Sequence, residues 1–177
     1  ISDCADMGFK DVIIADMGLL IYLDKLKING KLNIHISGEF GEMNSYQIKV
    51  LKELGAKRII YHRGCNLKDI ALMISRFPEL EHEVFLMNEN CHFTGAYCNS
   101  MHSDELIPMC RMPYLLEGRV EEVKTSCSEC DDYFDGCRLC LIDTFRQIGA
   151  THLKIVGRGA STDLMVDSIK RAKREIG

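Results

Sequence analysis

The sequence lacks the features that would mark a membrane protein or a nucleic-acid-binding surface. No apolar run approaches the roughly 18 residues of a membrane span, and the opening ISDCADMGF does not have the layout of a signal peptide. The net charge is −4, and the dense basic run KRAKRE (170–175) falls in an expected helix, where such a run is typical of a solvated face. We therefore expect a cytoplasmic protein with no membrane partner and no strong nucleic-acid signal.

The usual sequence devices of hydrolases are also missing. No H-E-x-x-H, G-x-S-x-G or Ser-His-Asp order occurs. A cysteine protease would need a thiolate activated by a nearby histidine, and the sequence adjacency of Cys91 and His92 does not establish such a pair. The sequence therefore offers no mechanism for peptide cleavage.

The sequence does contain a regular alternation of expected strands and helices. Short runs rich in Val, Ile and Leu predict buried strands at residues 11–16, 32–37, 58–63, 82–87 and 152–157. Helical patterns lie at residues 45–56, 66–78, 139–150 and 161–176. This alternation is typical of α/β proteins with a parallel sheet, and 177 residues fit a single domain, 1–177.

The number of units is too small for a complete barrel. A TIM barrel usually needs about 200 residues or more, so we expect a partial TIM-like (β/α) barrel, or a complete one of which this chain is a fragment, with an irregular Cys-rich insertion. An open barrel would expose sheet edges and would favour a homo- or hetero-oligomer.

Seven of the nine cysteines fall in one irregular segment, residues 88–140. The segment directly follows the expected strand 82–87, so it emerges where active sites of parallel α/β folds gather. In a reducing compartment, clustered thiols indicate metal or redox chemistry. The unequal spacing of Cys91, Cys98 and Cys110 favours an iron–sulfur cluster, whereas two later C-x-x-C pairs leave zinc as an alternative. Cys4 and Cys65, which are isolated, are expected to be buried apolar residues.

Side chains near the expected strand ends are candidates for binding or catalysis. Arg63, at the end of strand 58–63, would bind an acidic substrate, and His62 would serve in acid–base chemistry. Because neighbours on a strand alternate, only one of these two would face the barrel centre. Lys154 and Arg158 bracket the last strand, and the glycine-rich turn after it leads to a helix N-terminus that could bind a phosphate or carboxylate.

Other candidates lie beside the cysteines. Glu89 and His92 flank Cys91 and could reach a cluster-bound substrate. His102 could replace one cysteine as a metal ligand. His35, inside an expected strand, is predicted to be a histidine with a satisfied hydrogen bond in the core or at its rim.

Several stretches of the chain resemble one protein family. ADMGFKDVIIADMGLL (5–20), NIHIS (33–37) and LKELGAKRIIYHR (51–63) resemble the central part of the U32 peptidase family. HEVF (82–85), the Cys-x₆-Cys loop after it, and IGATHLKIVGR (148–158) continue the resemblance over nearly the whole chain.

The resemblance implies a TIM-barrel-like catalytic region. Family members were named as collagenase-type proteases, whereas others act in oxygen-independent hydroxylation of ubiquinone precursors or RNA bases and carry a four-cysteine 4Fe-4S cluster. By resemblance, Cys91 and Cys98 match two of the family's ligands, and Cys110 looks like a third. The fourth would be Cys140, with the alternatives Cys127, Cys130 and Cys137.

The chain also departs from the family pattern. Asn88, Glu89 and Asn90 stand where the family has small residues, the Cys-Ala-Gln-Pro-Cys motif is absent, and the first two βα units are missing. We expect iron–sulfur-dependent redox or hydroxylation-type chemistry on a small anionic or nucleobase-like substrate. The alternatives are a U32-type peptidase (a hydrolase) and a zinc-stabilised binding module without catalysis.

Overall fold

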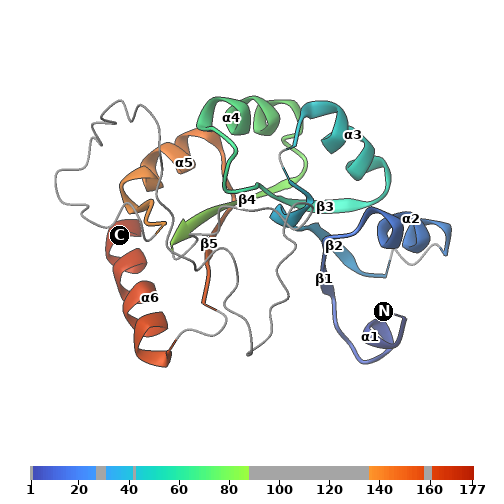
Figure 1. Ribbon diagram of the computed structural model, residues 1–177, viewed down its shortest axis with the longest axis horizontal. Helices are drawn as coiled ribbons and strands as arrows, with labels where there is room; N and C mark the ends of the chain where they lie inside the picture. Colours follow the sequence, from blue (N-terminus) through green and yellow to red (C-terminus); the bar gives the residue numbers. More distant parts are fainter. Residues whose placement is uncertain (1, 27–30, 42, 88–135, 158–160) are drawn as a thin grey trace, which may run out of the picture.

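A single curled sheet organises the protein. The computed structural model describes residues 2–26, 31–41, 43–87, 136–157 and 161–177 (Figure 1). Five parallel strands follow one another in chain order: β1 (Asp11–Ile14), β2 (Asn33–Ile36), β3 (Ala56–Ile60), β4 (Glu81–Met87) and β5 (His152–Ile155). Each unit adds its strand on the same side, without the reversal of a doubly wound sheet. The sheet forms a half-barrel, which confirms the expected partial TIM-like α/β fold.

Helices cover the outer, convex face of this sheet. The helices are α1 (Ser2–Asp6), α2 (Met17–Lys25), α3 (Ser45–Glu53), α4 (Leu67–Arg76), α5 (Ile142–Ile148) and α6 (Thr162–Ile176), with short 3₁₀ turns η1 (Gly38–Phe40) and η4 (Leu139–Leu141). Figure 1 shows α2 to α5 in a row along the convex side. The opposite, concave side is called the inner face below.

The helix starts follow from capping side chains. Each cap oxygen accepts a hydrogen bond from a backbone amide in the first turn, at 2.6 to 3.3 Å, and the capping residues are Asp16, Asn44, Asn66 and Ser161. Such a cap satisfies one of the amides that has no partner inside the helix. Gly149 ends α5 in the left-handed region, with φ of 91°, which favours glycine.

These elements match most of the sequence predictions. All five strands and the four expected helices are confirmed, with ends that differ by up to three residues. The expected strand end at Arg63 is wrong, because β3 stops at Ile60 and Arg63 lies in the turn that follows. Helix α2 was not singled out from the sequence.

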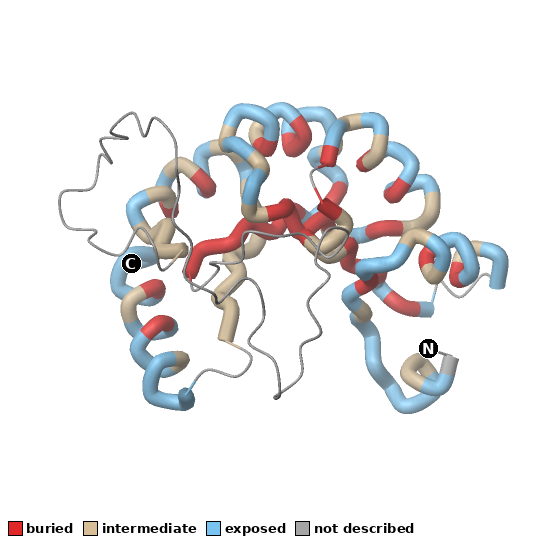
Figure 2. Tube along the Cα trace, in the orientation of Figure 1, coloured by how far each residue is buried: buried red, intermediate tan, exposed pale blue. Residues whose placement is uncertain are grey.

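The core lies between the sheet and the outer helices. Alternate strand residues face it, among them Ile14, Ile34, Ile59, Val84 and Leu86, and they meet buried side chains of α2 to α5 such as Leu20, Ile48, Met73 and Phe145. In Figure 2 the buried residues follow the strands and the sheet-facing sides of these helices. Full burial of one such side chain contributes roughly 1.5–3 kcal/mol.

One polar pair is built into this core between β3 and β4. The Tyr61 hydroxyl lies 2.8 Å from His82 Nδ1, and His82 Nε2 lies 2.9 Å from the Phe77 carbonyl oxygen. A carbonyl only accepts, so Nε2 carries the proton and Nδ1 accepts from Tyr61. Burial lowers the pKa of His82 and raises the pKa of Tyr61.

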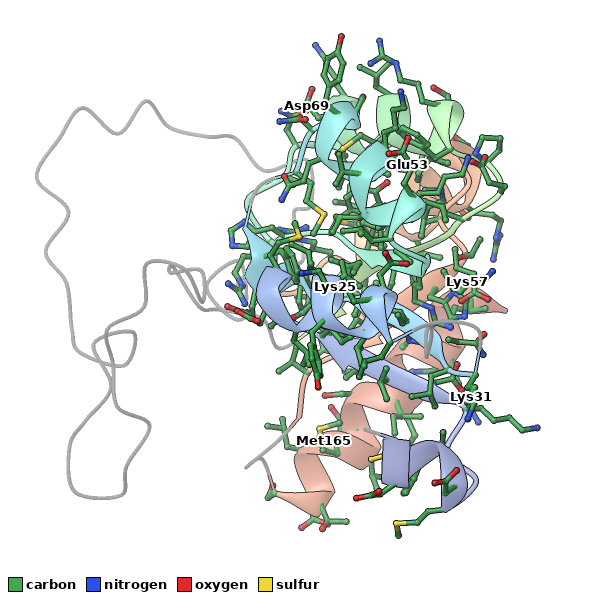
Figure 3. All side chains as sticks on the ribbon, turned by 90° about the vertical axis from the view of Figure 1, so that its right-hand side faces the viewer. Lys25, Lys31, Glu53, Lys57, Asp69 and Met165 are labelled. Carbon is green, nitrogen blue, oxygen red and sulfur yellow. The ribbon has the colours of Figure 1, made fainter. Side chains whose placement is uncertain are left out.

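Helix α6 packs closely against the chain just after β5. Met165, labelled in Figure 3, packs so closely on Gly157 that a Cβ there would lie 1.8 Å from the methionine sulfur. By contrast, the labelled Glu53, Lys57 and Asp69 are exposed (Figure 3). None of the described helices is long and apolar enough to cross a membrane.

Candidate functional site

The inner face of the sheet carries charged side chains where its outer face carries aliphatic ones. Residues that alternate with the core positions point to this face, and register places His35 beside Arg58, Arg58 beside Glu81, and Glu83 beside His152. His35 lies 3.3 Å from the Asp11 carboxylate and is 6% exposed, so it is a buried histidine with a polar partner on the inner face, at the rim of the core. Burial, followed by the charge of Arg58, lowers the pKa of His35.

Arg58 and Glu83 connect three strands through an inner-face ion cluster, formed by Arg58, Glu81, Glu83, His152 and Lys154. Arg58 donates to Glu81 at 2.7 Å and to Glu83 at 3.0 Å, and its third nitrogen lies 2.8 Å from His152 Nε2. Lys154 Nζ donates to the other oxygen of Glu83 at 3.1 Å. The hydrogen bond from Arg58 lowers the pKa of Glu81. The cluster therefore ties β3, β4 and β5 together across the inner face.

A second group of side chains, the edge cluster, lies at the C-terminal ends of the strands. It consists of Glu39, His62, Arg63, Phe85 and Lys154. The Arg63 guanidinium forms an ion pair with Glu39 and lies 5.6 Å from the Phe85 ring centroid, and Lys154 Nζ lies 5.8 Å from the same centroid. Two cations thus share one aromatic ring, at distances typical of cation–π contacts.

The backbone amide of Gly64 determines which ring nitrogen of His62 carries the proton. Gly64 N donates to His62 Nδ1 at 3.0 Å, and a neutral imidazole has a single acceptor nitrogen. Nε2 therefore carries the ring proton and faces Arg63 Nη1 at 3.2 Å. Because β3 has already ended, the expected alternation does not separate the two residues, and His62 and Arg63 lie against each other.

Glycine allows η1 to approach the strand ends closely. A Cβ on Gly38 would lie 3.2 Å from a Phe85 ring carbon and 3.3 Å from the Tyr61 carbonyl oxygen. These are tighter than ordinary packing contacts. The small residue lets the next residue, Glu39, reach Arg63 from the turn after β2.

The cysteine-rich segment leaves and rejoins the described fold at this same edge. The chain departs after Met87, the last residue of β4, and Arg138 N donates to the Leu86 carbonyl oxygen at 2.8 Å. The Arg138 side chain donates to the Arg63 carbonyl oxygen, also at 2.8 Å. Cys137 and Cys140 therefore lie close in sequence to a point that is fixed beside the edge cluster.

The sequence-derived candidates fall into three sets, of which the third, Cys137 and Cys140, is described but lies outside the edge cluster. His62, Arg63 and Lys154 come together in the edge cluster. The candidates that lie outside the described residues are Glu89, Cys91, His92, Cys98, His102, Cys110, Cys127, Cys130 and Arg158.

The remaining cysteines are described. Cys65, expected to be a buried apolar residue, is half-buried against the core, and its amide donates to the His62 carbonyl oxygen in the turn after β3. Cys4 is also half-buried rather than fully buried, and neither it nor Cys65, Cys137 or Cys140 forms a disulfide. Within the described part of the chain, no group of three or more His, Cys, Asp or Glu side chains is arranged to hold a metal.

Sequence analysis missed five residues that organise this region, namely Glu39, Arg58, Glu83, Phe85 and Arg138. A usable signal existed for Glu39, since it directly follows an expected strand and so lies at the edge where functional groups gather. Glu83 and Phe85 lie inside a strand, and their partners come from neighbouring strands. Only the register of the sheet places them beside Arg58, Arg63 and Lys154.

Comparison with known families gives a match over nearly the whole chain. The model of Peptidase family U32 matches residues 1–176. The chain belongs to the U32 family. The resemblance seen in the sequence is thereby confirmed.

Two curated U32-like relatives carry the same name, "tRNA hydroxylation protein P". The protein from Haemophilus influenzae is 27% identical over 93 residues, which are 52% of this chain and 20% of the relative. The protein from Helicobacter pylori is 29% identical over 72 residues, which are 41% of this chain and 17% of the relative. The matched stretches thus span about a fifth of each relative's length. No solved structure matches the chain significantly.

Proposed function

We propose that this U32 half-barrel acts in oxygen-independent hydroxylation of a nucleobase in tRNA, with its chemistry at the C-terminal edge of β3 to β5. Family membership and the name of the two relatives support this class of reaction. The observation that carries the proposal is the anchoring of the cysteine-rich segment beside Arg63 and Lys154, at the edge where α/β active sites gather.

We further propose that the segment holds a 4Fe-4S cluster. Thiolates are the donors that such a cluster takes, and the anchored return places Cys137 and Cys140 near the edge. The proposed ligands are Cys91, Cys98, Cys110 and Cys140, with Cys127, Cys130 and Cys137 as alternatives for the fourth. A bound cluster of this type supplies one-electron transfer.

The edge cluster supplies the protein's own contribution to substrate handling. Arg63 is held by Glu39 and by the Phe85 ring, so its guanidinium is oriented before substrate arrives. His62 presents a ring proton at Nε2 and is suited to donate it to a substrate oxygen or nitrogen. Lys154 on β5, which donates to Glu83, adds a second positive charge.

The test combines metal analysis with analysis of modified nucleosides. Protein purified without oxygen should contain nearly four iron and four sulfide per chain, and its visible absorbance should bleach with dithionite. Cells that produce a Cys91→Ser variant should lose a hydroxylated nucleoside from their tRNA, measured by mass spectrometry. Cys4→Ser, which changes an isolated cysteine, is the matched control and should retain it. Zinc without iron, or an unchanged nucleoside profile in Cys91→Ser, would refute the proposal.

A further inference from the structure

We propose that Arg63 is the centre of a binding site for an oxyanion, a phosphate or carboxylate group, and that Glu39 occupies this site until the ligand displaces it. The inference deepens the proposed function, on which it rests, because the anionic group would belong to the substrate handled at the same edge. It specifies which charged group of the ligand is recognised and which protein group competes with it.

The charge around Arg63 favours an anion. Among the described residues, the cations Arg63, Arg138 and Lys154 gather at this edge with the carboxylates of Glu39 and Glu83, which leaves one excess positive charge, while the whole chain carries a net charge of −4. The Arg63 side chain is only 9% exposed. A cation in such a setting interacts strongly with a nearby negative charge because water screens it little.

The donors at Arg63 suit an oxygen that accepts from several directions. Its Nη1 lies 3.2 Å from His62 Nε2, which carries a proton, and its Nη2 donates to Glu39. An oxyanion can take the place of the Glu39 carboxylate at Nη2, because the planar guanidinium matches phosphate and carboxylate groups.

Glu39 is the displaceable partner of Arg63. Its side chain is 38% exposed, and it lies on the three-residue 3₁₀ turn η1, which is followed by Gly41 with φ of 96°. His62 is buried and fixed by the Gly64 amide, and Phe85 is buried in its strand. When Glu39 moves away, Arg63 therefore still lies against the Phe85 ring, 5.6 Å from its centroid.

The test measures anion affinity and requires neither cluster chemistry nor turnover. The full chain is titrated with inorganic phosphate and, separately, with acetate at constant ionic strength, and binding is followed by NMR at the Arg63 side chain. Phosphate represents the phosphate of a nucleotide, and acetate represents a carboxylate. The probe with the lower Kd therefore identifies which of the two groups the site recognises. We expect Glu39→Gln to lower the Kd by about tenfold or more, because the ligand no longer breaks a charge-assisted hydrogen bond.

Two further variants make the result specific. Glu79→Gln removes another exposed carboxylate, the partner of Lys52, and should leave the Kd unchanged. Arg63→Lys keeps the charge but loses the forked geometry, and it should weaken binding. Equal or weaker binding by Glu39→Gln would overturn the proposal, as would equal tightening by Glu79→Gln or unchanged binding by Arg63→Lys. If anion binding fails these tests, the proposed function is still tested separately by the iron content and by the hydroxylated nucleoside in tRNA.

Discussion

Replacement of Glu83 by glutamine should destabilise the protein through the inner-face ion cluster. Glu83 is 10% exposed and accepts hydrogen bonds from both Arg58 and Lys154. Breaking a fully buried ion pair costs about 3–5 kcal/mol. Arg58 keeps Glu81 as a partner, and Lys154 is 28% exposed, so part of the loss is recovered. We therefore expect the free energy of unfolding to fall by about 2–3 kcal/mol.

The assay is equilibrium unfolding in urea, with Glu79→Gln as the matched control. With a slope of about 1–3 kcal/mol per molar urea, the loss corresponds to a midpoint lower by about 0.7–3 M. Glu79 pairs with Lys52 on the protein surface, where both side chains are about half exposed, so its replacement should shift the midpoint little. If the two variants lose the same amount, the inner-face cluster does not hold the strands together and this reasoning is wrong.

Two other outcomes follow from the structure. Burial lowers the pKa of His82 and His35, so below about pH 6.5, the pKa of a histidine in the unfolded chain, the unfolded chain binds more protons than the folded one. The free energy of unfolding should therefore be highest above that pH and should fall as the pH drops toward 5, which urea unfolding at pH 7.5 and 5.5 measures. An equal free energy of unfolding at the two pH values would contradict the neutral state of these buried histidines. Phe145→Ala should lower the free energy of unfolding by about 3–5 kcal/mol, because the ring is 1% exposed in the core. Leu164→Ala replaces a half-exposed side chain of α6 and should change it by less than about 1 kcal/mol. Thermal unfolding of the two variants compares them directly.

The sequence predicted the elements whose patterns are local. The helices expected at residues 45–56, 66–78 and 161–176 are capped by Asn44, Asn66 and Ser161, and such a cap involves only neighbouring residues. Helix α2 escaped notice because Leu19 to Leu23 form an unbroken apolar run, in which neither a helical nor a strand period stands out.

The candidate site was predictable only in part. Position at a strand end was enough to nominate His62 and Arg63. Their contact with each other was not predictable, because the end of β3 at Ile60 depends on pairing with its neighbours. The roles of Glu39 and Phe85 depend on how closely η1 packs, which a contact between residues distant in the sequence decides. The partners of Glu83 likewise required the register of three strands.

The hydrogen bond from Arg138 to Leu86 has a consequence for how proteins with this fold can diversify. Because the chain rejoins the sheet next to the place where it left, the length of the intervening stretch does not alter the register of β4 and β5. Doubling such a stretch costs only about 0.6 kcal/mol of closure entropy. Insertions and deletions between these two anchors, away from the proposed cluster ligands, can therefore change what is recognised while the five-stranded sheet is kept.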